Sequence, residues 1–553
     1  MNGSVAPPVL PPRYYLENFH KFVATVEQQY RDILTENERA FLSTFADASE
    51  ILQCLYVRLV SRRGPLFRAE ALHYPELGDL TAALAEGLRC GLLQQPEKPD
   101  FAHLARLLRK AELETIYAEH LPSQAGLRKP ELIQLLVSSL DQDQLLIPWK
   151  RWRSAQCALV QPMYTEVIVL LRLLFFGNDY QDLTEFVVSD LGYTQHASYP
   201  LDPEYRLFKS RQEVDEYLEL SALKTLMKEA AIKNDRGTLV ALGRRLRESA
   251  SGSVTEGVRD RLRLRLARQF EREGLYREAR ELYQRCGLHP ARQRLTRLLA
   301  EREPKTALAL CEKISADPWC EAERDFARRS RPTLAKRLGH KVSPLPRDRF
   351  DEDRLALPKP KSVERAAALH YLEGWPEAHH LENLLFNASF GLAFWQEIFL
   401  PVAGAFINPF QAAPLDMYTP RFERSRRVAL RRRLDHLSQC DLADTLLATY
   451  EQQQGITNSW VAWRAGLRSV LETALRTVPR QHWLAIWQRM LFDPEANRNG
   501  FPDLLLLNPG HGYRLVEVKG PGDQLQANQR RWLRFFQTAG IPAGICWVSW
   551  TDA

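Results

Sequence analysis

The segment PDLLLLNPGHGYRLVEVKGPGDQLQANQRRW, residues 502–532, decides the fold of the C-terminal part of this 553-residue chain. Its first part, LLLLN, is a short apolar run that ends at an Asn-Pro-Gly turn signal. The run YRLVEVKG alternates polar and apolar residues and is rich in residues that favour strands. Because the short connection PGHG separates the two runs, the segment predicts a β-hairpin.

The residues that follow predict one helix and a further strand. Trp532 and Phe536 are spaced to share one helix face, with Asp523 as the expected N-cap and Gly540 as the C-terminal stop. The run AGICWVSW, residues 543–550, is typical of another strand. The order strand, strand, helix, strand predicts an α/β domain at this end of the chain.

Two acids and a lysine occupy informative places on the predicted hairpin. A strand alternates its faces, so Glu517 and Lys519 point to one side and Val518 to the other. Carboxylates are ligands that Mg²⁺ and Mn²⁺ prefer, and a lysine stabilises negative charge on a reacting phosphate. Asp503 and Glu517 are therefore candidate metal ligands, the Val518 carbonyl a further ligand and Lys519 a catalytic cation. Ordinary surface charges are the alternative, because Pro-Asp and acid-x-Lys each occur a second time in the chain.

Length and composition describe a multidomain globular protein. At 553 residues, three or four domains are expected. The formal net charge of +7 is compatible with a polyanionic partner. The eight cysteines lie far apart without zinc-site spacing. The most apolar early run, VIVLLRLLFFG, is too short to span a bilayer, and the first residues lack a signal-peptide pattern. We expect an intracellular protein with a cytoplasmic location and no membrane partner.

The first 350 residues are predicted to be mostly helical. Residues 101–141 contain two helical patterns around a turn at Gly126 and resemble a SAP module, a small helical unit that docks on duplex DNA. Residues near Gly274 resemble half of a tetratricopeptide (TPR) repeat, and weaker helical pairs surround them. Residues 341–362, rich in proline and charge, predict an extended linker.

Arginines are concentrated in two places. RDRLRLRLARQ, beginning at Arg259, alternates arginines that cannot all lie on one helix face, so several must be plain solvated charges. The segment 421–433 carries seven arginines and one glutamate. Such a run is either a solvated face or a phosphate-binding surface. The expected DNA contacts are Lys129 of the SAP-like unit and, within 421–433, Arg424, Arg426, Arg427 and Arg431.

The C-terminal motif resembles the PD-(D/E)xK nucleases, in the branch with a virus-type replication-repair nuclease (VRR-NUC) domain. LVEVKGPGDQLQANQRRWL fits the pattern of that branch, and residues 390–418 are similar to a segment of the Fanconi-associated nucleases. The resemblance implies a Mg²⁺- or Mn²⁺-dependent 5′-flap endonuclease and 5′–3′ exonuclease that acts in interstrand-crosslink repair. It also implies a further acidic ligand, Glu382, on the helix before FGLAFW, and a site role for Gln529.

The resemblance divides the chain into four expected parts. The chain resembles the shorter bacterial form of the family: Cys/His pairs of a ubiquitin-binding zinc finger are absent near its start, so ubiquitin binding is not expected. Other protein partners are left open. The parts are a helical N-terminal domain (1–95), a SAP-like DNA-binding module (96–145), a TPR-like helical domain ending in a linker (146–362) and an α/β nuclease domain (363–553).

Three other functions stay open at this point. The same nuclease fold could cut other branched DNA, such as four-way junctions. The chain could be a DNA-binding scaffold with a relict nuclease fold, although the intact set of Asp503, Glu517 and Lys519 argues against this. It could also be a repeat-based protein adaptor, for which one good repeat is too few.

Overall fold

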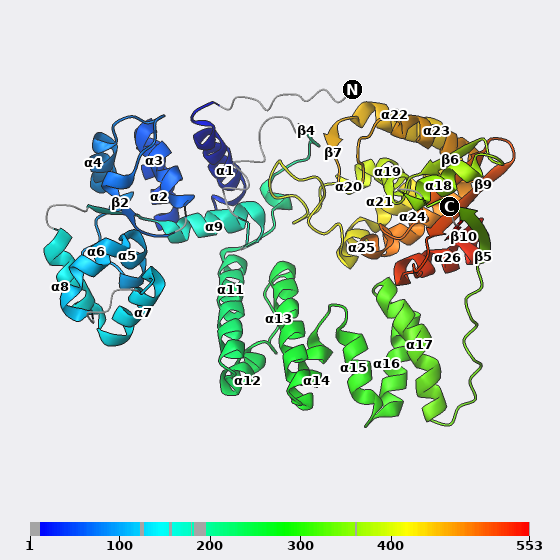
Figure 1. Ribbon diagram of the computed structural model, residues 1–553, viewed down its shortest axis with the longest axis horizontal. Helices are drawn as coiled ribbons and strands as arrows, with labels where there is room; N and C mark the ends of the chain where they lie inside the picture. Colours follow the sequence, from blue (N-terminus) through cyan, green and yellow to red (C-terminus); the bar gives the residue numbers. More distant parts are fainter. Residues whose placement is uncertain are drawn as a thin grey trace. The chain divides into compact units, whose positions relative to one another are not determined.

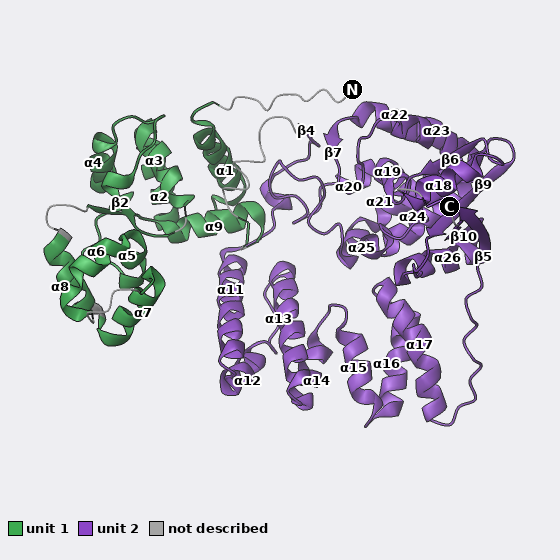
Figure 2. Ribbon diagram, viewed as in Figure 1, with its two compact units in different colours: residues 1–193 green, residues 194–553 purple. Residues whose placement is uncertain are grey.

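A computed structural model describes residues 11–62, 64–121, 127–153, 158–178, 180–181, 195–359 and 362–551. The chain divides into two compact units, residues 1–193 and 194–553 (Figure 2). Helices dominate both units, and the largest sheet lies in the second (Figure 1). The expected fold class, a mostly helical chain that ends in an α/β domain, is confirmed.

The first unit combines nine helices of the described residues with a three-stranded antiparallel sheet of order β1-β3-β2. Its strands are β1 (Phe67–Arg68), β2 (Leu93–Gln94) and β3 (Leu159–Pro162). Its helices are α1 (Tyr14–Tyr30), α2 (Glu36–Asp47), α3 (Glu50–Val60), α4 (Thr81–Cys90), α5 (Phe101–Leu107), α6 (Lys110–Ile116), α7 (Lys129–Ser139), α8 (Gln142–Arg153) and α9 (Thr165–Phe176).

The SAP-like segment forms a small body of its own within this unit. Helices α5 to α8 share a core that includes Leu104, Tyr117, Leu136 and Trp149. The Tyr117 hydroxyl donates a hydrogen bond to the Leu145 carbonyl at 2.7 Å, which ties α8 to the hairpin. Because β2 precedes these helices and β3 follows them, the small body is inserted between two strands of one sheet. The predicted turn at Gly126 lies outside the described residues.

Helix α9 belongs with the N-terminal helices. The rings of Phe22 on α1 and Phe175 on α9 lie 5.1 Å apart in an edge-to-face contact. The sequence predicted this helix as part of the TPR-like domain 146–362, and the boundaries of that domain stay predictions. In the described residues, α9 is also too short to cross a bilayer, and no other helix is long and apolar enough to do so.

Seven helices follow as successive neighbours at the start of the second unit (Figure 1). The predicted helix pair around Gly274 is present: Gly274 has φ +75°, a left-handed conformation that favours glycine, and it joins α13 to α14. Ala279 and Tyr283 are buried between these helices. The seven are α11 (Arg211–Ile232), α12 (Arg236–Arg245), α13 (Ser253–Arg272), α14 (Tyr276–Arg285), α15 (Ala291–Ala300), α16 (Pro304–Ala316) and α17 (Glu321–Arg337).

A five-stranded mixed sheet of order β5-β10-β9-β8-β6 forms the centre of the C-terminal part. Strands β8 and β9 make the predicted hairpin, α26 and β10 follow, and β10 runs parallel to both β9 and β5. The predicted order strand, strand, helix, strand is confirmed. The strands and helix are β5 (Asp351–Leu357), β6 (Glu377–His380), β8 (Leu504–Asn508), β9 (Gly512–Lys519), β10 (Ala543–Trp550) and α26 (Ala527–Ala539).

Two strands of this sheet contradict the sequence predictions. Strand β5 lies inside the expected linker and pairs with β10 over its whole length. Strand β6 replaces part of an expected helix and pairs antiparallel with β8. Both are edge strands, and edge strands are often polar and charged. Because both strands are polar, with residues such as Asp351 and His380, their sequences lack the apolar alternation that predicts a strand.

Helix α18 packs on one face of the sheet, and the remaining helices surround the other face. Their core contains Trp483 and Trp487, both fully buried. A short parallel pair, β4 (Gln195–His196) with β7 (Ile456–Thr457), lies outside the main sheet. The helices are α18 (Val363–Tyr371), α19 (Leu384–Ala393), α20 (Trp395–Ile398), α21 (Pro420–Gln439), α22 (Leu442–Gln453), α23 (Leu467–Thr477), α24 (Arg480–Phe492) and α25 (Pro494–Asn497).

The sheet separates two hydrophobic cores, and the alternation of its central strands decides which residues enter each. Leu504 and Val516 pack on the side of α18. Leu505 and Leu515 pack on the other side, with Trp532 of α26. By the same alternation Glu517 lies on the Leu515 side and Val518 on the α18 side, as predicted.

Candidate active site

The antiparallel register of β8 and β9 brings the three predicted residues together. Leu504 pairs with Val516, so Asp503, one residue earlier, lies beside Glu517, one residue later. The Val518 amide donates a hydrogen bond to Asp503 Oδ2 at 2.8 Å. Lys519 Nζ lies 2.8 Å from Glu517 Oε1 in an ion pair. These contacts form a compact set of two carboxylates and one ammonium group at the end of the hairpin.

Burial disfavours the charged forms of the two carboxylates when no metal ion is bound. The Glu517 side chain is 1% exposed, and burial, together with the negative charge of Asp503, raises the pKa of Glu517 to about 8. Burial also raises the pKa of Asp503 above its usual value. Two neighbouring carboxylates that resist ionisation are stabilised in the charged form by a bound cation.

The donor set suits a hard divalent cation. Neither Glu517 oxygen receives a hydrogen bond of standard geometry from the described residues, although Lys519 and Gln529 lie near enough to lower its pKa. Among those residues, no group of three or more His, Cys, Asp or Glu side chains is arranged to hold a metal ion. Mg²⁺ is commonly held by one or two carboxylates, with water and substrate phosphate completing its shell. Asp503 and Glu517 fit that arrangement.

Glu382 borders the site from an unexpected backbone position. It lies in the turn after β6 with φ +44°, so the expectation that it lies on a helix is wrong. The amides of Leu381 and Glu382 both donate to the Asp503 carbonyl, at 3.0 and 3.2 Å. Its side chain is 64% exposed, with His380 Nε2 3.5 Å from Oε1. Left-handed backbone at a residue other than glycine is uncommon and concentrates at functional sites.

One further acid at the site was not singled out from the sequence. Glu364, in the first turn of α18, accepts a hydrogen bond from the Ser362 hydroxyl at 2.7 Å. Burial opposes its ionisation, but Ser362, His380 and Lys519 together lower the pKa of Glu364. The helix-start pattern Ser-Val-Glu at 362–364 could have marked this acid, but only the fold shows that α18 begins beside Lys519.

Aromatic packing holds the loop that carries Asp503. The Phe501 ring lies 4.1 Å from that of Trp532 and stacks on Phe386 at 4.4 Å. Gly500 has φ +89°, and a β-carbon there would lie 2.8 Å from the Asn528 side chain, so this close approach to α26 requires glycine. The position of Asp503 therefore depends on α26.

The start of α26 differs from the prediction. Its N-cap is Gln526, whose amide donates to the Gln529 side chain at 2.9 Å. Asp523 instead accepts a hydrogen bond from the Gly520 amide at 2.9 Å, which closes the turn after Lys519. Gln529 thus caps the helix and lies close to Glu517. Its predicted site role stays a prediction.

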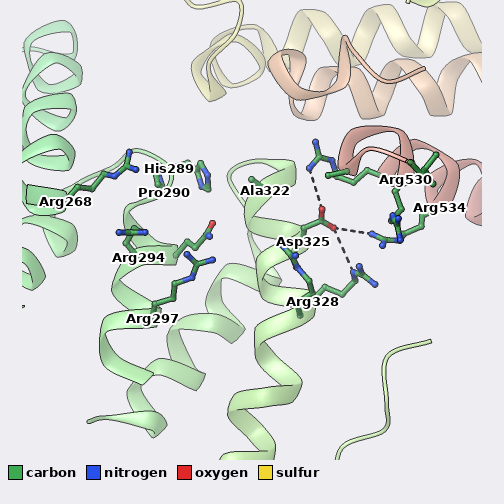
Figure 3. Close-up of a pocket in the computed structure, with 15 residues that line it drawn as sticks. Arg268, His289, Pro290, Arg294, Arg297, Ala322, Asp325, Arg328, Arg530 and Arg534 are labelled. Carbon is green, nitrogen blue, oxygen red and sulfur yellow. Dashed lines mark hydrogen bonds and ion pairs between the residues drawn. The ribbon is translucent and has the colours of Figure 1, made fainter. Parts of the chain in front are cut away.

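A cavity of about 660 Å³ lies between α26 and the helices α13, α15 and α17. Among the described residues, Asp325 is the one acid in its lining, and it forms ion pairs with Arg328, Arg531 and Arg534 at 3.5–4.0 Å (Figure 3). The arginines that line it come from α13, α15, α17 and α26, and they are Arg268, Arg294, Arg297, Arg328, Arg329, Arg530, Arg531 and Arg534.

The arginine surface continues along α13. An adjoining groove of about 460 Å³ shares Arg268 and Arg294 with the cavity. It adds Arg261, Arg265 and Arg272, which lie on one face of α13. In contrast, Arg259 and Arg263 of the same helix are buried and bind carboxylates and carbonyls of the neighbouring helices and of α13 itself. The structure thus shows which arginines of α13 line the groove and which are buried, a distinction that the sequence did not allow.

The predicted DNA contacts of α21 are only partly compatible with the structure. Arg426 is buried and bonded to Asp416 at 2.9 Å, so it is a core residue and the expectation that it contacts DNA is wrong. Arg427 is exposed and pairs with Glu423 at 3.0 Å. Arg424 and Arg431 are exposed. In the first unit, Lys129 Nζ donates to the Arg106 carbonyl at 2.8 Å.

Family models assign the C-terminal sheet and the helices around it to a nuclease class. The VRR-NUC domain model matches residues 438–550, and the model of the FAN1 HTH domain matches residues 13–94. A Fanconi-associated nuclease 1 homolog from Pseudomonas aeruginosa is 35% identical over 98% of this chain and 97% of its own length. The chain belongs to the Fanconi-associated nuclease family.

Other relatives and a solved structure extend this result. The Arabidopsis thaliana homolog is 27% identical over 97% of this chain and 67% of its own length. The Homo sapiens protein is 23% identical over 97% of this chain and 62% of its own length. A crystal structure of paFAN1 bound to 5′-flap DNA with a two-nucleotide flap and a gap matches with a TM-score of 0.81 and 34% identity, covering 99% of this chain and 100% of that chain.

Proposed function

We propose that this nuclease hydrolyses phosphodiester bonds of 5′-flap DNA, as an endonuclease near the junction and as a 5′–3′ exonuclease, with Mg²⁺ or Mn²⁺ as its cofactor. The observation that carries the proposal is the buried Asp503–Glu517–Lys519 set, a PD-(D/E)xK arrangement on paired strands. The match to relatives solved with 5′-flap DNA supports the substrate. Family membership supports a role in interstrand-crosslink repair.

The chemistry is divided between a metal and the side chains of the chain. Asp503 and Glu517 would hold the metal, with the Val518 carbonyl and Glu382 as further ligands. When bound, the metal supplies Lewis acidity at the phosphate and a more acidic water. Lys519, fixed by Glu517, is placed to orient the attacking water and to stabilise the charge that develops on the phosphate. Glu364 and His380 lie at the border of this site.

The arginine cavity is proposed to hold the DNA backbone beside the site. Leu525 and Ala527 line the cavity, and they follow the turn that begins at Lys519. The lining offers many guanidinium groups for few carboxylates, and guanidinium groups bind phosphates without reading sequence. A nuclease that recognises the shape of a branch requires contacts of this kind. Contacts of Lys129, Arg424, Arg427 and Arg431 with DNA stay predictions.

Replacing Arg268 by glutamate should weaken binding of 5′-flap DNA by about tenfold near 0.1 M salt, because one phosphate contact is lost and a repulsive charge is added. The salt slope of log K should fall by about one. Titrations by fluorescence anisotropy at several salt concentrations measure both quantities. Arg277→Glu is the matched control, since Arg277 is 88% exposed on α14 and lines neither pocket. An equal loss in both variants would contradict the assignment.

The proposed function is tested by cleavage of end-labelled DNA with Mn²⁺, Mg²⁺ or EDTA. We expect metal-dependent cutting of a 5′-flap duplex near its junction, no cutting in EDTA, and slower cutting of an unbranched duplex of the same sequence. Preferential cutting of a four-way junction would show that the substrate is another branched DNA, while metal-dependent phosphodiester hydrolysis would still hold. Binding of the flap without cutting in either metal would favour the scaffold alternative.

A further inference from the structure

A second basic groove of about 550 Å³ runs along helix α21 and shares no lining residue with the arginine cavity. Its rim carries Arg424, Arg427 and Arg431, whose spacing places them on one face of the helix. Asp317 and Glu423 are the acidic residues of its lining. Its floor is apolar and consists of Pro318, Trp319, Leu430, Leu434, Leu491 and Phe492.

The rim arginines are available to an incoming anion. Arg424 and Arg431 are exposed and have no ion pair with any residue of the described ranges. Arg427 is paired with Glu423, but an exposed pair four residues apart on a helix is weak and exchanges readily with a better partner. The groove therefore offers three guanidinium groups that can each bind a carboxylate in a bidentate manner.

The floor favours a peptide over a nucleic acid. The guanidinium of Arg292 lies 3.7 Å from the Trp319 ring, and that of Arg324 lies 3.9 Å from the Phe492 ring. One face of each ring is thus already covered, which prevents the ring from inserting between bases. Leucine and proline beside these rings give phosphate and sugar groups no partner, since protein–DNA interfaces are strongly polar. An apolar side chain would gain free energy by burial there.

We propose that this groove binds an acidic peptide segment of a partner protein. One aromatic or leucine side chain of the segment occupies the apolar floor, while neighbouring carboxylates bind Arg424, Arg427 and Arg431. The combination of an apolar anchor with flanking charges provides both affinity and orientation. This assignment replaces DNA as the partner of these three arginines and leaves the arginine cavity to the nucleic acid.

The test uses the full chain and a fluorescein-labelled peptide, Asp-Asp-Leu-Asp-Asp-Phe. In fluorescence anisotropy at low salt we expect saturable binding with a Kd below about 100 μM, a range ordinary for a short peptide. Arg431→Glu should weaken binding by about tenfold or more, because attraction becomes repulsion. The matched control is Arg432→Glu, which makes the same charge change at the next exposed residue, outside the groove lining. Peptides with serine for Leu and Phe, or with asparagine for the aspartates, should bind at least about tenfold more weakly.

Three results would overturn the proposal. The first is no saturation at peptide concentrations up to about 1 mM. The second is an equal effect of Arg431→Glu and Arg432→Glu on the peptide. The third is competition between the peptide and 5′-flap DNA, together with a larger loss of DNA binding in Arg431→Glu than in Arg432→Glu, which would assign the groove to DNA. Flap cleavage by the wild-type chain, measured on the same preparation, distinguishes these failures from failure of the proposed function.

Discussion

Glu517→Gln is expected to abolish cleavage of 5′-flap DNA, by at least about a thousand-fold, and at the same time to stabilise the metal-free protein at pH 8. Cleavage is lost because a neutral amide is a poor ligand for a hard cation and cannot fix Lys519 through an ion pair. Stability is gained because the wild-type protein keeps a buried carboxylate beside Asp503. The same change therefore acts in opposite directions on activity and on the free energy of unfolding.

The sign of the pH effect follows from the pKa of Glu517, which rises from 4.5 to about 8 on folding. The folded state binds the proton more tightly than the unfolded state, so the contribution of this group to stability is present below about pH 4.5 and is lost as pH rises towards 8. Glutamine does not titrate. In EDTA, the melting temperatures of variant and wild type should be similar at pH 5, and the variant should melt higher at pH 8.

The measurement is thermal unfolding in EDTA and in Mn²⁺, at both pH values, with cleavage assays on the same preparations. Mn²⁺ should raise the melting temperature of the wild type at pH 8 and leave the variant unchanged, because only the wild type binds the ion there. Glu377→Gln is the control, since Glu377 lies on the neighbouring edge strand β6 and pairs with His379 rather than with the site. A variant that melts lower than the wild type at pH 8 in EDTA would contradict the electrostatic assignment.

The clustering of Asp503, Glu517 and Lys519 could be predicted from sequence because it depends on local rules. A hairpin with two-residue alternation fixes which side chains of β9 share a face, whatever packs around it. Edge strands β5 and β6 were missed because their charged residues carry no alternating apolar pattern, and only pairing with β10 and β8 reveals them. Glu364 was missed for a related reason, since its link to Lys519 depends on where α18 is packed.

Local sequence rules do not predict which arginines of a helix are buried. Helical spacing alone separates Arg426 from Arg424 and Arg431 on α21, but it does not say which face is buried. Tertiary packing decides this, and Arg426 enters the core with Asp416 as its partner. The arginine run at 421–433 was therefore enough to predict a basic surface. It was not enough to predict which of its arginines lie on that surface. Arg263 of α13 is a second example, since its side chain is only 2% exposed.

Trp532→Ala is expected to lower both stability and cleavage, and its comparison with Trp487→Ala separates the two effects. Each tryptophan is buried in the same core cluster, so each truncation should lower the free energy of unfolding by about 3–5 kcal/mol. Only Trp532 contacts Phe501, two residues before Asp503, and its indole also donates to the Asn499 carbonyl at 3.1 Å. Trp487 instead stacks on Trp483 and donates to Ser389.

The two variants should therefore melt at similarly reduced temperatures but differ in cleavage rate at a temperature where both stay folded. Loss of the Trp532 contact leaves the loop before β8 without its support on α26, and small displacements of a catalytic group lower rates by about a hundred-fold. Single-turnover cleavage of 5′-flap DNA at saturating protein measures this step without a contribution from binding. Circular dichroism at the assay temperature verifies that both variants are folded. If Trp487→Ala slows cleavage as much as Trp532→Ala does, the loop is not positioned by α26, and the loss reflects general loosening of the core.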